Sequence, residues 1–212
     1  MGKLPMGKLL IVRHGETEWN AEGRIQGHTD VALSERGIEQ ARMAARRLAH
    51  FQIDAAYSSD LRRSSQTARM ILGERDAPLS TTWLLREYHK GVFEGLTAEE
   101  TRKRYPELYA ASLVKDLDFA PSGGETTRQT SRRIAGFVAE IKERHQGDTV
   151  LIVGHGGSLR AAFVALLELP LEANWRFELA NCGLSMVDIY PDNAVLRLYN
   201  DTSHLDGLGP GL

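Results

Sequence analysis

The sequence predicts an α/β fold of three layers (α/β/α), in which a mostly parallel sheet carries helices on both faces. Short apolar runs alternate along the chain with longer segments whose apolar residues recur at helical spacing. Strands that alternate with helices are typical of a parallel sheet covered on both faces. The length of 212 residues suits one compact domain, so we expect residues 1–212 to form a single domain.

The first half of the chain contains three strand-like segments separated by two helical ones. Residues 8–12 (KLLIV) form a short apolar run typical of a buried strand. Ser34 is a suitable N-cap for a helix over residues 36–51, because its hydroxyl can accept a backbone N–H of the first turn. The pattern then predicts a strand, a helix and a third strand at residues 53–57, 60–74 and 78–83.

The middle of the chain, residues 85–123, has no clear periodicity. Gly91, Gly95, Pro106 and Pro121 interrupt it. Glycine and proline are the strongest local breakers of helices and strands. We therefore expect loops and short helices here, which form an insertion that acts as a lid.

The second half returns to regular patterns. It predicts a helix, a strand and a helix at residues 126–145, 149–153 (TVLIV) and 158–169, followed by two strands at 184–190 and 195–199. The two final strands are apolar, and an exposed strand edge can pair with another chain, so a homodimer is a possibility. The glycine-rich tail after Leu205 is expected to be loosely held.

Composition and charge exclude several classes of protein. The formal net charge of −2 gives no indication of a nucleic-acid partner. No apolar run approaches the ~20 residues of a membrane helix, and residues 1–7 lack the apolar stretch of a signal peptide. Cys182 is the only cysteine, which rules out an intrachain disulfide and fits a cytoplasmic protein. The letters MGKL occur twice at the start, which indicates either an alternative start at Met6 or a non-native addition over residues 1–5.

Two of the predicted strands end in a histidine beside glycine. His14 follows the first strand and His155 follows the strand at residues 149–153. Ligands of open α/β sheets bind at the carboxyl ends of the strands, so we expect the two imidazoles to meet at one site. The adjacent glycines allow backbone N–H groups to approach an anion closely.

Arginines and one acid accompany the histidines. Arg13, Arg62 and Arg63 lie at the junctions of predicted elements, and arginine binds phosphate oxygens with two parallel hydrogen bonds. Glu87 follows the third predicted strand. A neutral His14 is a suitable nucleophile for phosphorus, and Glu87 is placed to protonate the leaving alkoxide and then to activate water. This set of residues predicts stepwise phosphoryl transfer.

The same residues resemble the signature motifs of the histidine phosphatase superfamily, which includes cofactor-dependent phosphoglycerate mutase. Within the superfamily, the chain looks most similar to bacterial α-ribazole phosphatases and broad-specificity phosphatases. The resemblance implies the phosphoglycerate mutase-like α/β fold. Five segments in the order of the family carry it: residues 10–20 (LIVRHGETEWN), 24–37 (RIQGHTDVALSERG), 57–68 (YSSDLRRSSQTA), 85–96 (LREYHKGVFEGL) and 153–160 (VGHGGSLR).

The resemblance also implies a role for each matching position. It makes His14 the nucleophile, Glu87 the general acid and base, and Arg13, Arg63 and His155 the residues that hold the phosphoryl oxygens. Further phosphate or substrate contacts are implied for Asn20, Gln26, Gly27 and Gly156. The family needs no metal or cofactor, and the sequence has no spaced cluster of histidines and cysteines that indicates one.

Other polar residues remain open at this stage. Arg62 is expected to be a solvated residue at a helix start or an ion-pair partner, with substrate contact the less favoured interpretation. His89 is as consistent with a surface loop as with a substrate contact. His28 and His204 lie near matched segments, where a pocket rim and a structural role are equally well supported.

Hydrolysis and transfer use the same phosphohistidine, so the catalytic residues do not separate them. The mutases of the superfamily tend to be longer, with an extended insertion and tail that close the site, and this chain looks shorter in that respect. Residues 200–205 (NDTSHL) also resemble the ending of bacterial phosphatases. We therefore expect a metal-independent phosphatase that acts on a small phosphorylated metabolite. Phosphoglycerate mutase is the alternative enzyme, and a non-catalytic binder of phosphorylated ligands is the alternative of another class.

Overall fold

A six-stranded sheet forms the centre of the molecule in the computed structural model, which describes residues 5–208. The strands lie in the order β3-β2-β4-β1-β5-β6. Four neighbours, from β3 to β1, are mutually parallel, whereas β5 is antiparallel both to β1 and to β6. The prediction of a mostly parallel sheet is therefore confirmed. The strands are β1 (Gly7–Arg13), β2 (Ala55–Ser59), β3 (Leu79–Thr82), β4 (Thr149–Gly154), β5 (Leu184–Ile189) and β6 (Ala194–Asp201).

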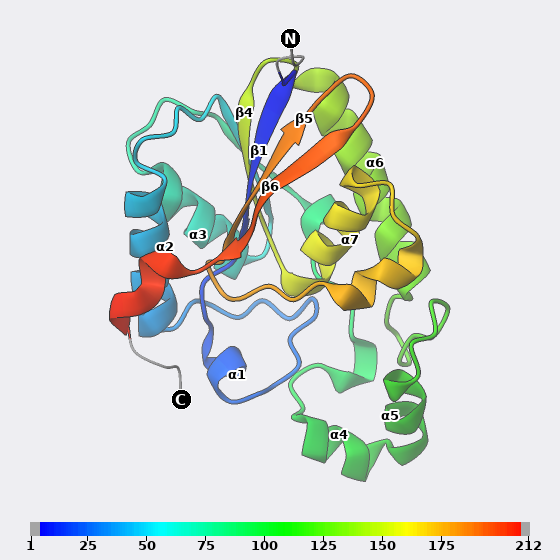
Figure 1. Ribbon diagram of the computed structural model, residues 1–212. Coiled ribbons are helices and arrows are strands. Elements are labelled where there is room, and N and C mark those ends of the chain that lie inside the picture. Colours follow the sequence, from blue (N-terminus) through cyan, green and yellow to red (C-terminus); the bar gives the residue numbers. More distant parts are fainter. Residues whose placement is uncertain (1–4, 209–212) are drawn as a thin grey trace.

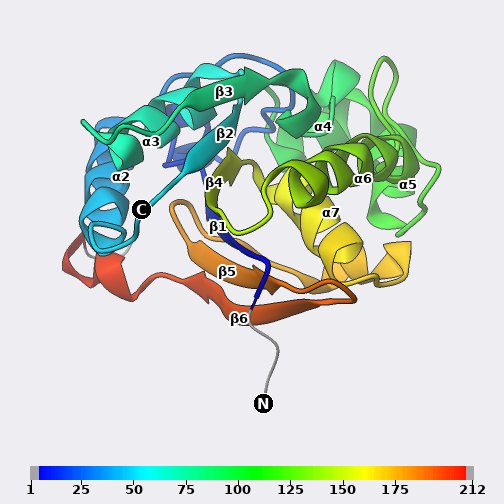
Figure 2. The ribbon, with the colours of Figure 1, turned by 90° about the horizontal axis from the view of Figure 1, so that it is seen from above.

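Helices cover both faces of this sheet, as predicted. The pair α2 and α3 packs on one face and the pair α6 and α7 on the other, as Figures 1 and 2 show. The helices are α1 (Glu18–Ala21), α2 (Glu35–Arg47), α3 (Arg62–Leu72), α4 (Ala98–Arg104), α5 (Pro106–Leu113), α6 (Thr127–Arg144) and α7 (Gly156–Leu166). None of the helices in residues 5–208 has the length and apolar character needed to cross a membrane.

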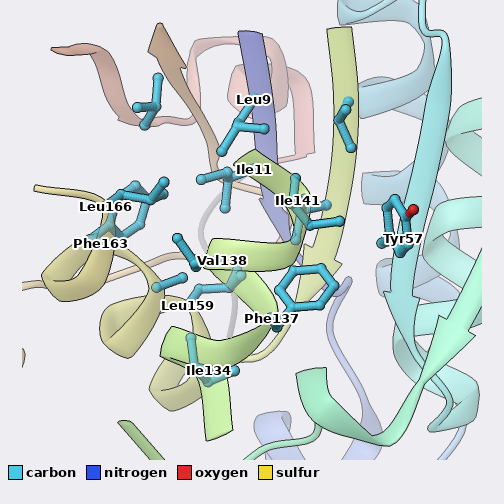
Figure 3. Close-up of a cluster of buried hydrophobic side chains, with 14 of the residues drawn as sticks. Leu9, Ile11, Tyr57, Ile134, Phe137, Val138, Ile141, Leu159, Phe163 and Leu166 are labelled. Atoms are coloured by element: carbon cyan, nitrogen blue, oxygen red, sulfur yellow. The ribbon is translucent and has the colours of Figure 1, made fainter. Parts of the chain in front are cut away.

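Strand β1 explains why the core has two halves. Its alternate side chains point to opposite faces of the sheet, because successive residues of a strand face opposite ways. Leu9 and Ile11 pack with α6 and α7 in one buried cluster, part of which Figure 3 shows, whereas Leu10 and Val12 pack with α2 and α3 in the other. A strand that is apolar on both faces is the pattern expected of a parallel sheet covered on both sides.

The segment between residues 85 and 123 contains short elements and loops, as expected. Two 3₁₀ turns flank Glu87, at Trp83–Leu85 and Gly91–Phe93, and α4 and α5 follow. Figure 1 places α4 and α5 beyond the end of the sheet at which β1 finishes. The segment thus extends from the same end of the sheet as the histidines, at the carboxyl ends of β1 and β4.

The predicted bounds of the helices and strands were wrong by up to four residues; for example, the helix predicted over residues 158–169 is α7, at Gly156–Leu166. Helix α2 ends at Arg47 rather than at residue 51, because Leu48 is buried in the core and the chain turns, with the Phe51 N–H donating to the Leu48 carbonyl. The chain after Leu205 is not loose throughout, since the 3₁₀ turn Ser203–Leu208 packs against α2. Residues 209–212 of the tail, and residues 1–4 of the start that was questioned as non-native, lie outside the described residues.

The packing of Phe163 generates a test of the core on the α6–α7 face. Its ring is fully buried and lies 5.7 and 5.6 Å from the ring centres of Phe177 and Tyr199. We expect Phe163→Ala to lower the free energy of unfolding by about 3–5 kcal/mol, because it removes buried contacts and leaves a cavity. Leu113→Ala is the matched control, since the Leu113 side chain is 66% exposed, and should change it by less than about 0.5 kcal/mol. Equal losses in urea-induced unfolding would contradict this description of the core.

Candidate active site

The two strand-end histidines meet. Strands β1 and β4 are parallel neighbours in a register that pairs Arg13 with Gly154, so the next residues, His14 and His155, leave the sheet at the same level. The His14 N–H donates to the Gly154 carbonyl (2.9 Å), and the imidazole ring centres are 5.0 Å apart. Both side chains are buried. The structure therefore brings together the residues that the sequence placed at one site.

His14 is held as a neutral imidazole in a defined tautomer. Its Nδ1 lies 2.7 Å from the Gly15 carbonyl oxygen, which can only accept, so Nδ1 carries the hydrogen and Nε2 keeps its lone pair. Burial lowers the pKa of His14 well below its ordinary value, and the positive charges of Arg63 and Arg13 lower it further. An unprotonated Nε2 is what a nucleophilic histidine requires.

His155 lies in the same place but is bonded to protein on both ring nitrogens. The Arg63 Nε–H donates to Nδ1 (3.1 Å), so the ring hydrogen is on Nε2, which donates to the Ser64 hydroxyl (3.2 Å). Burial, followed by the charge of Arg63, lowers the pKa of His155 well below its ordinary value. The imidazole is thus neutral and helps to orient Arg63.

Arg63 and Arg13 supply the positive charge. Arg63 is fully buried, and it donates through its two terminal nitrogens to the carbonyls of Thr29 and Gly27, each at 2.8 Å. Burial lowers the pKa of Arg63 to about 10, so it remains a cation at neutral pH. Arg13 donates to the Leu179 carbonyl (2.6 Å), but its buried Nε has no hydrogen-bond partner. A buried donor of this kind indicates a ligand that would complete it.

The side chains surround a cavity of about 210 Å³. We call it the phosphate pocket. It brings together nearly all the residues that the sequence singled out, and it adds Arg24, Ile25 and Lys90: the full lining is Arg13, His14, Asn20, Arg24, Ile25, Gln26, Gly27, Arg63, Glu87, Lys90 and His155. Gly156 begins helix α7 at its border, where a Cβ atom would lie 3.7 Å from Arg13 Nε.

Amide side chains are oriented toward the same pocket. The Asn20 Oδ1 accepts from the N–H and the hydroxyl of Thr17, both at 3.1 Å, which leaves its Nδ2 group as a donor for another partner. The buried Gln26 Oε1 has no hydrogen-bond partner. The Asn181 Nδ2 donates to the His14 carbonyl (2.9 Å), so Asn181 supports the nucleophile from outside the matched motifs. No sequence signal pointed to Asn181, because it approaches His14 only through the fold.

Glu87 lies against the N-terminus of α7. Its two carboxylate oxygens accept the N–H of Gly157 (2.9 Å) and that of Ser158 (3.2 Å). Helix N-termini favour negative charge because their first N–H groups have no partner within the helix. Only glycine permits this approach, since a Cβ atom at position 157 would lie 2.2 Å from Glu87 Oε1.

The charge state of Glu87 differs from the protonated form expected from the sequence. Burial raises the pKa of Glu87, but the combined effect of Lys90, the N–H groups of Gly157 and Tyr88, and Arg160 is larger and in the opposite direction. The pKa therefore lies below its ordinary value, and the group is a carboxylate at neutral pH. The reason is that the helix N-terminus and the cations reach Glu87 only in the folded chain.

The residues left open by the sequence occupy different places. Arg62 begins α3, and its exposed side chain lies 3.3 Å from the Asp30 carboxylate, outside the pocket lining. His28 donates through Nε2 to the Glu87 carbonyl (2.9 Å) and therefore positions the backbone of the acid. The ring of His89 contacts that of His28, with centres 4.6 Å apart. His204 lies in the 3₁₀ turn that packs on α2.

Curated relatives match nearly the whole chain. "Phosphoserine phosphatase 1" of Hydrogenobacter thermophilus is 34% identical over 200 residues, which cover 94% of this chain and 95% of the relative. "Probable phosphoglycerate mutase GpmB" of Yersinia pestis is 37% identical over 213 residues, which cover 95% of this chain and 96% of the relative.

Solved structures agree with these relatives. A putative alpha-ribazole-5'-P phosphatase from Escherichia coli superposes with a TM-score of 0.86 at 33% identity, over 92% of this chain and 96% of that one. Phosphoserine phosphatase from Entamoeba histolytica, in complex with 3-phosphoglyceric acid, superposes with a TM-score of 0.80 at 32% identity, over 94% and 100%. The fold shared with these proteins is the phosphoglycerate mutase-like α/β fold that the motifs implied.

The family model described as histidine phosphatase superfamily (branch 1) matches residues 9–202. This span begins in β1 and ends just after β6, and it contains all five motif segments. Together with the relatives, the match confirms the family that the motifs resembled. The chain belongs to the histidine phosphatase superfamily.

Proposed function

We propose that the protein is a metal-independent phosphatase that hydrolyses small phosphomonoesters through a phosphohistidine on His14. The observation that carries this proposal is a neutral imidazole whose Nδ1 is bonded to the Gly15 carbonyl, so that its Nε2 is the nucleophile in an arginine-lined pocket. Relatives named as phosphatases over almost the full length support it.

The first half of the reaction transfers the phosphoryl group to the enzyme. The lone pair of His14 Nε2 attacks phosphorus, the P–N bond forms, and the P–O bond to the alcohol breaks. Arg13 and Arg63 balance the charge on the phosphoryl oxygens, with Arg13 Nε gaining the partner that it lacks in the protein alone. Asn20, Gln26, Gly27 and Gly156 are the proposed further contacts around the substrate. His155 orients Arg63, and its own proposed contact with a phosphoryl oxygen requires the Nε2–H to leave the Ser64 hydroxyl.

The leaving alkoxide takes its proton from Glu87. Because Glu87 is ionised in the free protein, it must acquire that proton when the substrate binds. A phosphate group in the pocket places negative charge near the carboxylate, and like charges raise the pKa of a carboxyl group. In the second half, Glu87 removes a proton from water, the water oxygen attacks phosphorus, and the P–N bond breaks to release phosphate.

Turnover of p-nitrophenyl phosphate with EDTA present tests this proposal. Release of p-nitrophenol without added metal is the expected result. A requirement for Mg²⁺ or Zn²⁺, or binding of phosphate with no turnover of any ester, would overturn it. The second of these results would favour a non-catalytic binder of phosphorylated ligands. The presence of both His14 and Glu87 argues against such a binder, because binding alone requires neither a nucleophile nor an acid.

Phosphoglycerate mutase remains the second candidate, because a relative named as a probable mutase is 37% identical over 95% of this chain. Transfer and hydrolysis differ only in the nucleophile that attacks the phosphohistidine, which is a hydroxyl of a second substrate in transfer and water in hydrolysis. Conversion of 3-phosphoglycerate after priming with bisphosphoglycerate, without net release of phosphate, would favour the mutase.

We also propose the domain organisation, the oligomeric state and the cellular location of the protein. Residues 1–212 act as a single domain, in which the segment 85–123 is a lid over the substrate; the position of α4 and α5 beyond the strand ends supports this. Strand β6 lies at an edge of the sheet, which supports pairing with a second copy. A cytoplasmic location is supported by a lone, buried cysteine.

Replacing the acid should reveal its role through the leaving group. We expect Glu87→Gln to reduce kcat by about 10²–10⁴-fold for alkyl phosphates, because glutamine cannot donate a proton to the alkoxide. p-Nitrophenyl phosphate should suffer much less, because p-nitrophenolate leaves without protonation. Glu99→Gln is the control, since Glu99 is exposed and pairs with Lys103 on α4. Steady-state kinetics that show equal losses on both esters would argue against the acid role.

The pH dependence follows from the low pKa of Glu87. A complex of ionised Glu87 with a monoanionic ester contains the proton that the alkoxide needs, whereas a complex with the dianion lacks it. We therefore expect kcat/KM for an alkyl phosphate to fall as the pH rises above about 6, where phosphomonoesters lose their second proton. A constant kcat/KM between pH 6 and 8 would contradict this assignment.

A further inference from the structure

A second cavity adjoins the phosphate pocket. It has a volume of about 280 Å³, and it shares Ile25 and Lys90 with the phosphate pocket. Its walls come from the segment after Glu87, from the loop after α5 and from the 3₁₀ turn Leu171–Arg176 that follows α7. A phosphomonoester with its phosphoryl group beside His14 can place its alcohol portion here. We call this space the alcohol cavity.

Buried polar side chains converge on the alcohol cavity. Tyr88 and Asn174 are 4% and 2% exposed, and the Tyr88 hydroxyl interacts with the side chains of Asn174 and Thr127. The Arg160 Nε, on α7, is buried and has no hydrogen-bond partner. Buried polar groups are nearly always hydrogen-bonded in native proteins. The Arg160 Nε is an exception that faces this space, which indicates that a polar ligand completes it.

Two cations that form no close ion pair also face the cavity. Lys90 and Arg160 line it, and neither forms an ion pair within 4 Å in residues 5–208. The Lys90 ammonium lies 4.7 Å from the centre of the Tyr88 ring. Burial lowers the pKa of Lys90, and the charge of Arg160 lowers it further, while Glu87 raises it. An additional negative charge in this space would stabilise both cations.

We propose that Lys90 and Arg160 bind a carboxylate on the alcohol portion of the substrate, so that the enzyme selects phosphate esters of small hydroxy acids. This inference rests on the proposed phosphatase function and names its substrate class. Because Lys90 lines both cavities, the carboxylate lies within a few bonds of the ester oxygen. Glu125 and Asp116, on the walls of the alcohol cavity, can accept from a hydroxyl or ammonium group of the same substrate.

Glu125 is well fixed for that secondary role. Its carboxylate pairs with Arg133 at 2.9 Å and accepts the His89 N–H at 3.0 Å. Its orientation is thus set by the protein before a substrate arrives. Lys90 and Arg160, by contrast, have no carboxylate partner within 4 Å in the described chain, which is why we assign the recognition of charge to them.

Two pairs of esters that differ only in the carboxylate test the proposal. O-Phospho-L-serine is compared with O-phosphoethanolamine, and 3-phosphoglycerate with glycerol 3-phosphate. The ratio of kcat/KM within each pair is the readout, because general damage to catalysis cancels in it. In both pairs, we expect kcat/KM of the wild-type enzyme to be about tenfold or more higher for the ester that carries the carboxylate. A hydrogen bond to a charged group contributes a free energy that corresponds to a factor of this size.

Lys90→Met and Arg160→Met should each reduce that preference about tenfold, since each removes one charge and keeps most of the side-chain volume. Lys103→Met is the matched control, because Lys103 is exposed on α4 and pairs with Glu99 outside both cavities, and it should leave the ratio unchanged. Thermal unfolding shows whether each variant folds. If one of the two variants does not fold, the ratio measured with the other variant tests the proposal.

The outcomes separate this inference from the proposed function. Turnover of p-nitrophenyl phosphate with equal rates within both pairs would overturn the recognition of a carboxylate and leave the phosphatase intact. A preference that survives both substitutions would assign the selection to other residues and also overturn it. Equal losses on both members of a pair would show that Lys90 only balances the charge of Glu87. Absence of turnover on every ester would overturn the phosphatase function itself.

Discussion

The parallel pairing of β1 with β4 is the constraint on which the site depends. The register that pairs Arg13 with Gly154 brings two histidines, 141 positions apart in the sequence, together at the carboxyl ends of these two central strands. Ladder hydrogen bonds hold this register, because β1 pairs with β4 on one side and with β5 on the other. The packing of its side chains against helices on both faces supports the same register. A catalytic distance is therefore set by the most buried part of the fold.

Burial and charge then act together on the chemistry of that point. Burial and then the cations Arg63 and Arg13 keep His14 neutral, and the same cations are available to phosphoryl oxygens. Lys90 and the N-terminus of α7 keep Glu87 a carboxylate in the free protein. Each group is thus prepared for a phosphate before binding, which is how positioning and electrostatics contribute most to phosphoryl transfer.

The sequence predicted the parts of the fold and site that depend on local pattern. Apolar runs that end in His14 and His155 predicted two strands of the sheet and the meeting of the two imidazoles, and the motif segments predicted that Glu87 lies beside them. The end of α2 at Arg47 and the bonding of His155 to Arg63 and Ser64 could not be predicted, because they depend on tertiary packing. Lys90 stood within a matched segment, but only the fold shows that it borders two cavities.

The covalent intermediate is the central claim, and trapping it is the most direct measurement. The enzyme is mixed with a phosphomonoester, quenched in alkali within one turnover and digested for mass spectrometry. The account predicts an acid-labile phosphate on the imidazole of His14 that forms and decays at least as fast as kcat, and no such adduct in His14→Ala. Full turnover without a phosphorylated enzyme, or with the phosphate on Ser64 or another residue, would contradict it.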